Sequence, residues 1–459
     1  MTLSFDALII GTGQAGPSLA ARLCAAGLKT AVFERKQFGG TCVNTGCMPT
    51  KTMIASAYAA YLARRAADFG VSLPGGVSVD MKKVKARKDA VSRASREGTE
   101  SSLRSLPGCT VVAAHARFTS PRTVEADGVV YSAERIFINV GGRAALPPLP
   151  GLQGVPYLTN SSMMEVDFLP RRLLIIGGSY VALEFAQMFR RFGADVTIVE
   201  TGPRLVKKED EDVSAAIRDI LTGEGIDVRL NAPCISVAQR GSDVVARLDC
   251  SDGAEGEAVG SHLLLAAGRR PNTDDLGLQN AGIDVDSRGY VVVDEKLSTS
   301  APGVWALGDC NGRGAFTHTS YNDFEIVAAN LLDNESRTVA DRIPAYAIYI
   351  DPPLGRAGMT ETEARGKGLR VLVGKRPMTR VSRAVEKGDT RGFMKVIVDA
   401  GSQRILGAAI LGTGGDEVIH EILDIMYADA PFPVLRRAVH IHPTVSELVP
   451  TMLGELTGP

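Results

Sequence analysis

A short nucleotide-binding pattern constrains the fold of this chain more than any other feature. Its first copy is an apolar run, ALII (7–10), followed by the turn GTGQAG, an amphipathic helical pattern and a second apolar run ending at Glu34. Strand, G-x-G-x-x-G, helix, strand and acidic residue, in this order, are typical of dinucleotide binding. Gly11, Gly13 and Gly16 let the backbone approach a pyrophosphate at the helix N-terminus, and Glu34 accepts hydrogen bonds from a ribose.

The same pattern recurs in the second quarter of the chain. An apolar run, RLLII (172–176), leads into GGSYVA at Gly177, then a helical pattern and a strand ending at Glu200. The first glycine and the acidic residue are 23 positions apart in both copies. Ser179 replaces the middle glycine, and its Cβ limits the approach of a pyrophosphate, so this copy is the weaker signal. The sequence predicts two similar α/β nucleotide-binding units.

The second acidic residue also indicates which nucleotide binds there. A carboxylate at the end of that strand favours a free 2′-hydroxyl over a 2′-phosphate, so Glu200 predicts NAD(H) in preference to NADP(H). Three cations follow it, Arg204, Lys207 and Lys208. They are either attractors of a 2′-phosphate or solvated charges beside the acidic run EDED (209–212).

Bulk composition excludes several classes of function. A net charge of −1 gives no basic surface for nucleic acid or an anionic membrane. No run approaches the ~20 apolar residues that span a bilayer, and the N-terminus lacks the basic region of a secretory signal. Seven scattered cysteines do not form the framework of a secreted disulfide-rich protein. We therefore expect a cytoplasmic protein.

Two of the cysteines lie close together in GGTCVNTGCMPTK (39–51). In a regular helix, residues five apart have Cα atoms about 8.7 Å apart, whereas a disulfide needs roughly 4.4–6.8 Å. Cys42 and Cys47 can therefore bond only where the backbone leaves helical geometry. Gly46 lowers the free-energy cost of that departure, and Pro49 suits the first turn of a following helix. A zinc site would need a second pair of ligands, so a redox-active thiol pair is favoured and no metal is expected.

This segment and four others resemble the flavoprotein disulfide reductases, the family of dihydrolipoamide dehydrogenase, glutathione reductase and mercuric reductase. The other segments are LLLAAGRRPNT (263–273), APGVWALGDCNGRGAFTHTSYNDFEIVAANLL (301–332), DPPLGRAGMTE (351–361) and HIHPTVSE (440–447). The amino-acid sequences of several segments are most similar to those of mercuric-reductase-like members. The resemblance implies an α/β fold with two Rossmann-like domains, for FAD and NAD, and a C-terminal α+β dimerisation domain.

The resemblance also implies domain boundaries. The FAD domain comprises 1–145 and 273–342, the NAD domain 146–272, and the dimerisation or interface domain 343–459. Helices are expected over 51–69 and 80–107, after the redox segment.

Residue roles follow from the same resemblance. Cys47 would be the charge-transfer thiolate against the flavin, and Cys42 the interchange thiol that attacks the substrate. His442 would be the base, oriented by Glu447, both reaching across from the partner subunit of a homodimer. Lys51 and Glu184 would form a buried ion pair beside the flavin.

Cofactor contacts are implied as well. Tyr180 would cover the flavin until nicotinamide displaces it, and two sets of residues would contact FAD and NAD. The FAD set is Gly11, Gly13, Gly16, Glu34, Thr41, Lys51, Gly141, Gly308 and Asp309. The NAD set is Gly177, Ser179, Tyr180, Glu184, Glu200 and Gly268.

The chain also departs from its relatives. The NVG of IFINVGGRAALPPLPG (136–151) stands where many relatives carry Ala-Thr-Gly. No cysteine follows Cys310, so the terminal pair that delivers mercuric ion is missing and mercury is not expected as the physiological substrate.

The sequence therefore predicts an FAD-dependent NAD(P)H:disulfide oxidoreductase. It would pass two electrons through Cys42 and Cys47 to a small disulfide, dithiol or other oxidant. The alternatives are the dihydrolipoamide dehydrogenase of a complex, acting on a lipoyl-carrying protein, and a mercuric-like metal-ion reductase. No motif identifies the electron acceptor.

Overall fold

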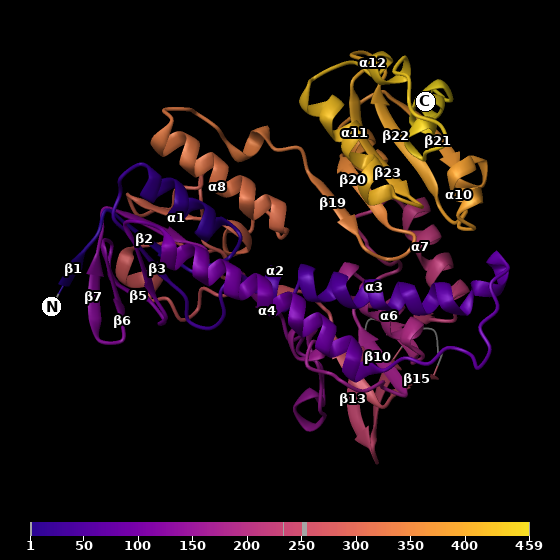
Figure 1. The fold of residues 1–459 in the computed structure, drawn as a ribbon, viewed down its shortest axis with the longest axis horizontal. Helices are drawn as coiled ribbons and strands as arrows, with labels where there is room; N and C mark the ends of the chain where they lie inside the picture. The colour runs from indigo at the N-terminus through magenta and orange to yellow at the C-terminus, as the bar shows by residue number, and fades with distance from the viewer. Residues whose placement is uncertain (1, 233, 250–254, 459) are drawn as a thin grey trace.

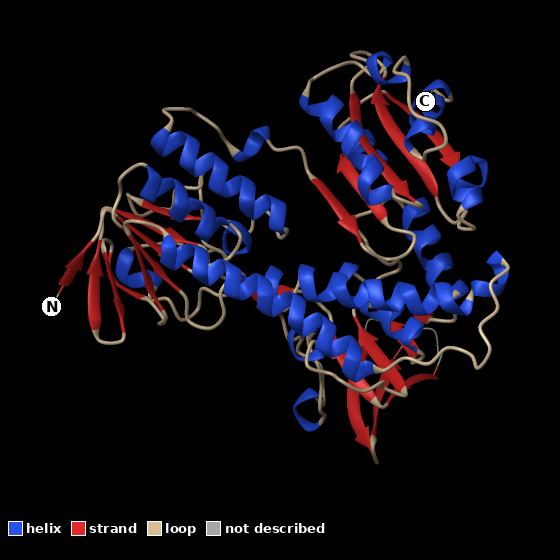
Figure 2. Ribbon diagram, viewed as in Figure 1, coloured by secondary structure: helices blue, strands red, loops and turns tan. Residues whose placement is uncertain are grey.

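Three groups of sheets make up the molecule, and two long helices run between them (Figure 1, Figure 2). The computed structural model describes residues 2–232, 234–249 and 255–458. The two long helices are α3 (Cys47–Arg64) and α4 (Met81–Ser105), which pack against each other. The N-terminus and the C-terminus lie at opposite ends of the molecule (Figure 1).

The first group is built around a parallel sheet. Its strands lie in the order β18 (Val304–Ala306), β8 (Arg135–Ile138), β2 (Ala7–Ile10), β3 (Thr30–Phe33) and β4 (Cys109–Val112). Every residue of β2 and β3 is buried, which explains their continuous apolar sequences. Helices α1 (Ala15–Ala25) and α8 (Thr317–Leu332) pack side by side on this sheet (Figure 1).

A second, four-stranded sheet flanks the first. Its strands lie in the order β1 (Thr2–Ser4), β7 (Val129–Ser132), β6 (Thr123–Ala126) and β5 (Arg117–Ser120).

The second group repeats the parallel design. Its strands lie in the order β12 (Asp227–Arg229), β11 (Asp195–Val199), β10 (Arg172–Ile176) and β16 (His262–Leu265), with α6 (Tyr180–Phe192) packed against them. An antiparallel sheet of β13 (Cys234–Arg240), β14 (Asp243–Asp249) and β15 (Glu255–Gly260) adjoins it. Strands β9 (Gly142–Ala144) and β17 (Arg269–Pro271) pair where the chain enters and leaves this group.

The third group is an antiparallel sheet with helices around it. Its strands lie in the order β19 (Ala345–Ile348), β20 (Leu354–Gly358), β23 (Ile405–Leu411), β22 (Phe393–Asp399) and β21 (Val371–Pro377). Helix α11 (Gly415–Tyr427) packs against β20 and β23.

The predicted fold class is confirmed, because two parallel α/β units precede an α+β unit. Strand β18 completes the first sheet although it follows the second group in the chain. The first unit is therefore built from two separate segments. The boundaries at 145, 272 and 342 stay predictions.

The helix expected over 51–69 was wrong at both ends. It begins at Cys47 and ends at Arg64, and a short 3-10 helix (Ala66–Phe69) follows. The helix expected over 80–107 is Met81–Ser105, with Asp80 as its N-cap, accepting a hydrogen bond from the backbone N–H of Lys83.

Candidate active site

The two cysteines of the redox segment lie on different helices. Cys42 is in α2 (Gly40–Asn44), and Cys47 is the first residue of α3. Between them the backbone is not helical at Thr45 (φ −142°, ψ 14°) or Gly46 (φ −131°, ψ −120°). Glycine is needed at 46, because a Cβ there would lie 2.8 Å from the carbonyl oxygen of Thr41. The backbone thus has the break that a Cys42–Cys47 disulfide requires.

The two thiols are electrostatically unequal. A hydrogen bond from Cys42 lowers the pKa of Cys47 to about 6, and the Thr317 hydroxyl and the Lys51 ammonium act in the same direction against burial. The same hydrogen bond, together with burial, raises the pKa of Cys42. Cys47 therefore carries the negative charge near neutral pH, and Cys42 keeps its proton.

Helix N-termini add to this asymmetry. Cys47 is the first residue of the 18-residue helix α3, and Thr317, which contacts its sulfur, is the first residue of the 16-residue helix α8. The unpaired N–H groups at a helix N-terminus carry a partial positive charge that favours an anion. Two such termini therefore lie at the Cys47 sulfur.

An ion pair stands beside the thiols. The Lys51 ammonium on α3 lies 2.8 Å and 3.0 Å from the two carboxylate oxygens of Glu184 on α6. Glu184 is 4% exposed and also accepts a hydrogen bond from the backbone N–H of Tyr349 at 3.0 Å. The Lys51 ammonium lies 4.5 Å from the centroid of the Tyr349 ring. Burial of this carboxylate is thus compensated by one cation and one backbone donor.

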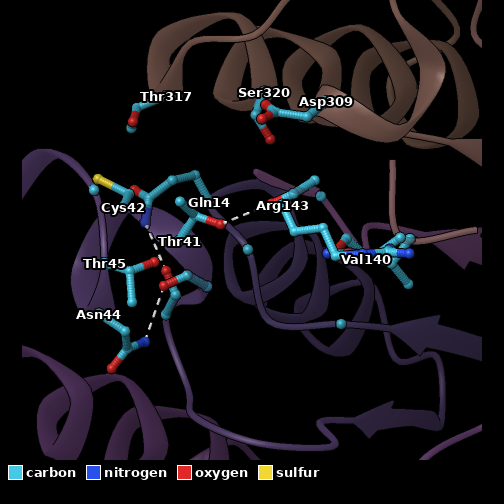
Figure 3. Close-up of a pocket in the computed structure, with 18 of the residues that line it drawn as sticks. Gln14, Thr41, Cys42, Asn44, Thr45, Val140, Arg143, Asp309, Thr317 and Ser320 are labelled. Carbon is cyan, nitrogen blue, oxygen red and sulfur yellow. Dashed lines mark hydrogen bonds between the residues drawn. The ribbon is translucent and has the colours of Figure 1, made fainter. Parts of the chain in front are cut away.

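The cysteines and the ion pair face a cavity of about 1000 Å³. Figure 3 shows Thr41 and Cys42 on one side of it, with Thr317, Ser320 and Asp309 on the facing side. The residues predicted as site residues that line it are Gly11, Gly13, Glu34, Thr41, Cys42, Cys47, Lys51, Gly141, Tyr180, Glu184 and Asp309. Gly16 and Gly308 do not line it. The volume is at the upper end of the roughly 300–1,000 Å³ typical of ligand pockets.

The residues at one end of the cavity fit a dinucleotide. The glycine turn packs tightly, because a Cβ on Gly11 would lie 2.4 Å from the carbonyl oxygen of Asn139 and a Cβ on Gly13 would lie 2.7 Å from its Oδ1. This packing brings the N-terminus of α1 to the cavity wall, where a pyrophosphate is favoured. The Glu34 carboxylate stands at the end of β3, where it accepts hydrogen bonds from the N–H and hydroxyl of Thr12.

The second glycine turn lies apart from this cavity. Gly177 has φ +121°, and a Cβ there would lie 2.4 Å from the carbonyl oxygen of Ala266. Ser179 is the N-cap of α6, and Glu200 directly follows β11, with Oε1 accepting a hydrogen bond from the N–H of Gly202 at 2.8 Å. None of Gly177, Ser179, Glu200 and Gly268 lines the cavity. From the same unit, Tyr180 and Glu184 do reach it.

His442 and Glu447 form a hydrogen-bonded pair away from the cavity. His442 Nδ1 lies 2.9 Å from Glu447 Oε2, and neither residue lines the cavity. The His442 side chain is 74% exposed, and its neighbours Val439 and Ile441 are 99% and 80% exposed. The other histidine of the motif, His440, hydrogen-bonds instead with Glu421 at 2.8 Å.

Comparison with known proteins decides the family. The model of the "Pyridine nucleotide-disulphide oxidoreductase" family matches residues 5–323, and its "dimerisation domain" matches 344–453. The chain belongs to the pyridine nucleotide-disulphide oxidoreductases. The predicted family is therefore confirmed, and so is the enzyme class, a flavin-dependent oxidoreductase acting between NAD(P)H and a disulfide. Family membership supports FAD as the cofactor, and the dimerisation domain indicates a homodimer.

Relatives of several activities resemble this chain over nearly its full length. It is 35% identical to the probable pyridine nucleotide-disulfide oxidoreductase RclA of Escherichia coli over 96% of this chain and 97% of the relative. It is 33% identical to a dihydrolipoyl dehydrogenase of Thermus scotoductus (97% and 95%) and 32% identical to a mercuric reductase of Staphylococcus aureus (91% and 76%). A solved Cu(II) complex of Escherichia coli RclA, a flavoprotein disulfide reductase, superposes with a TM-score of 0.88 at 35% identity, covering 98% of this chain and 99% of that one. No helix in the described ranges has the length and apolar character of a membrane span.

Several residues of this oxidoreductase's cavity were missed by sequence reasoning. Thr317 contacts Cys47, Arg269 pairs with the Asp309 carboxylate at 3.1 Å, and Tyr349 contacts both members of the ion pair. Asn139 is buried and accepts a hydrogen bond from the N–H of Gly16 at 3.1 Å while donating to the carbonyl of Leu307 at 2.8 Å. Asn139 is the first residue of the NVG departure, so the sequence did mark its position.

Proposed function

We propose that this enzyme takes electrons from NADH and passes them through Cys42 and Cys47 to a small oxidant, with the interchange step at Cys42. Bound FAD would supply a hydride acceptor for the reduced nicotinamide and a two-electron donor for the Cys42–Cys47 disulfide. Cys47 is suited to hold the resulting negative charge, because its pKa is lowered to about 6. The placement of the Cys47 sulfur, at the start of α3 and 3.2 Å from the Thr317 hydroxyl, is the observation that carries the proposal.

The interchange step needs a thiolate at Cys42 as well. Because the pKa of Cys42 is raised, a base must take its proton before it attacks a substrate disulfide. His442 of the partner subunit is proposed as that base, with Glu447 holding the ring through Nδ1. The exposed position of His442 beside two exposed apolar side chains supports this arrangement, since apolar residues at such exposure are typical of an interface.

The remaining cofactor residues are proposed in the roles that the resemblance implies. The N-terminus of α1 holds the FAD pyrophosphate, Glu34 its ribose, and Asp309 the ribityl chain. Gly177 and Ser179 would hold the nicotinamide dinucleotide, and Tyr180, Lys51 and Glu184 would contact the flavin. The few, scattered cysteines do not make the disulfide framework of a secreted protein, which supports a cytoplasmic location.

NADH is proposed as the donor in preference to NADPH. Glu200 stands at the end of β11, where its carboxylate meets a ribose 2′-hydroxyl in this type of fold and repels a phosphate. Arg204, the nearest cation in sequence, already donates a hydrogen bond to the carbonyl of Lys207 at 3.2 Å.

A metal ion is the second candidate for the acceptor. RclA, 35% identical, has been solved as a Cu(II) complex. Cu(II) takes one electron per ion, so one reduced Cys42–Cys47 pair would reduce two ions and return to the disulfide. Thiolates prefer the Cu(I) product, which supports this candidate. A dihydrolipoamide dehydrogenase activity stays a third possibility, supported by the relatives of that name.

Anaerobic reduction of the holoenzyme by NADH, followed in the visible spectrum, tests the central proposal. A long-wavelength shoulder after two electrons is expected if the thiolate of Cys47 lies against the flavin. Bleaching without a shoulder would contradict it. Turnover is then compared with small disulfides, dihydrolipoamide with NAD⁺, a lipoyl-domain protein, and Cu(II) with a Cu(I)-specific chelator. The substrate with the highest kcat/KM identifies the acceptor class.

A further inference from the structure

Two cysteines outside the cavity lie against each other. Cys24 is in the last turn of α1, and Cys109 is the first residue of β4. Both are partly exposed free thiols, and neither lines the cavity. The Cys24 side chain hydrogen-bonds with that of Cys109. The proposed reaction uses neither residue.

The backbone fixes this proximity. After Cys24 the chain turns sharply at Gly27, whose N–H donates to the carbonyl of Cys24 at 2.9 Å. It returns as β3, where the N–H of Thr30 donates to the carbonyl of Gly108 at 3.0 Å and Thr30 pairs with Cys109 in parallel register. The end of α1 and the start of β4 are thus held together by the sheet. The proximity of the two thiols therefore follows from the backbone of the sheet and the turn after α1.

The two thiols differ in reactivity. Burial, and next the neighbouring Cys24, raise the pKa of Cys109 to about 11. Cys109 therefore keeps its proton at neutral pH, which suits it to resolve an oxidised neighbour and not to attack the oxidant first. A reactive cysteine beside a second thiol that can resolve it is the arrangement of a reversible oxidation site.

We propose that Cys24 and Cys109 form a second redox pair, which hydroperoxides oxidise to a disulfide independently of Cys42 and Cys47. The Cys24 sulfur attacks the terminal peroxide oxygen and gives up its proton, the O–O bond breaks, and the leaving alkoxide takes up a proton as alcohol. The sulfenic acid on Cys24 is then attacked by the Cys109 sulfur, which forms the S–S bond and releases water. Two thiols lose two electrons in total, and the hydroperoxide gains them.

The cross-link would act on the flavin-binding unit. It joins the last turn of α1, whose N-cap residue Gln14 lines the cavity, to β4 at the edge of the parallel sheet. It also closes a loop of the chain that contains the redox segment and helices α3 and α4. Closing a long loop restricts the unfolded chain, so the oxidised unit resists unfolding better than the reduced one.

Peptide mapping of the oxidised holoenzyme tests the proposal. The holoenzyme, without NADH, is treated with hydrogen peroxide, alkylated, digested without reductant and examined by mass spectrometry. A Cys24–Cys109 cross-linked peptide is expected, together with a rise of about 2–5 °C in the thermal unfolding midpoint, reversed by dithiothreitol. Full alkylation of both cysteines after peroxide treatment would overturn the proposal.

Matched variants separate this pair from the active-site pair. Cys24→Ser and Cys109→Ser should each lose the cross-linked peptide and the rise in midpoint while keeping the NADH turnover of the untreated enzyme. In a Cys42→Ser/Cys47→Ser enzyme the peptide should still form at the wild-type rate. Its disappearance there, or a peptide joining Cys24 to Cys42, would show that the active-site pair carries the oxidation and would overturn independence.

Discussion

The hydroxyl oxygen of Thr317 lies 3.2 Å from the sulfur of Cys47, although the two residues are 270 positions apart. The hydroxyl can donate to a thiolate, and it arrives at the N-terminus of α8. Because the hydrogen bond is made to the charged form of Cys47, it lowers the pKa of that residue. A residue in the first turn of α8 thus lowers the pKa of a cysteine in α3.

Removing this hydroxyl should weaken the thiolate. A hydrogen bond to a charged group is worth about 1.5–3 kcal/mol, so Thr317→Val should raise the pKa of Cys47 by about 1–2 pH units. The measurement is the pH dependence of Cys47 alkylation in the reduced enzyme, quantified by mass spectrometry. Thr317→Ser keeps the hydroxyl and serves as the control. An unchanged pH profile in Thr317→Val would show that the contact does not stabilise the thiolate.

The wild-type enzyme should show a corresponding pH dependence. Because the pKa of Cys47 is lowered to about 6, the thiolate is present above that pH and is lost as the pH falls through it. The long-wavelength absorbance of the two-electron-reduced enzyme should therefore be constant near neutral pH and decline at lower pH with a midpoint of about 6. A midpoint close to the ordinary value of a thiol would contradict the assignment of Cys47.

The repeated glycine pattern was predictable because its determinants are local. Strand, turn, helix and acidic residue follow one another within each copy, and positive φ or close backbone contact requires glycine at Gly11 and Gly177. The break between Cys42 and Cys47 was predictable for the same reason, since helix geometry alone excludes a disulfide within a regular helix.

Contacts made by distant segments were not predictable from spacing. Thr317 and Tyr349 reach Cys47 and Glu184 only because α8 and the segment after β19 fold against α3 and α6. Asn139 was seen as a departure from related sequences, but its link between Gly16 and Leu307 needs the folded sheet. Pro49 lies in the first turn of α3 as predicted, but the expected range of 51–69 began too late. The start at Cys47 places the thiolate at a helix N-terminus.

Breaking the ion pair should cost stability as well as activity. Lys51→Met leaves the Glu184 carboxylate buried with only the Tyr349 N–H as donor. Losing one partner of a fully buried pair costs about 3–5 kcal/mol, and since Lys51 is about one-third exposed we expect about 1–3 kcal/mol. Denaturant unfolding measures it. The double variant Lys51→Met/Glu184→Gln should recover part of the loss, and a loss as large as in Lys51→Met would contradict charge burial as the cause.

The nucleotide preference should depend on Glu200. Glu200→Ala removes the carboxylate that is proposed to accept hydrogen bonds from the ribose, so the KM for NADH should rise about tenfold, the value of one charged hydrogen bond. The KM for NADPH should fall or stay unchanged, because repulsion of the 2′-phosphate is removed. Steady-state kinetics with both nucleotides measures this. Equal use of NADH and NADPH by the wild-type enzyme would contradict the proposed preference.

A subunit-mixing experiment should show whether His442 acts across the dimer. Cys42→Ser and His442→Ala each inactivate the enzyme if both residues are needed. When the two variants are co-expressed with different affinity tags, a mixed dimer has one site with intact Cys42 and the partner's intact His442. Random assortment then gives about a quarter of the wild-type activity in the pool, since half the dimers are mixed and each has one competent site of two. If His442 served the cavity of its own chain, every site would lack one residue, and mixing would give no activity above either parent.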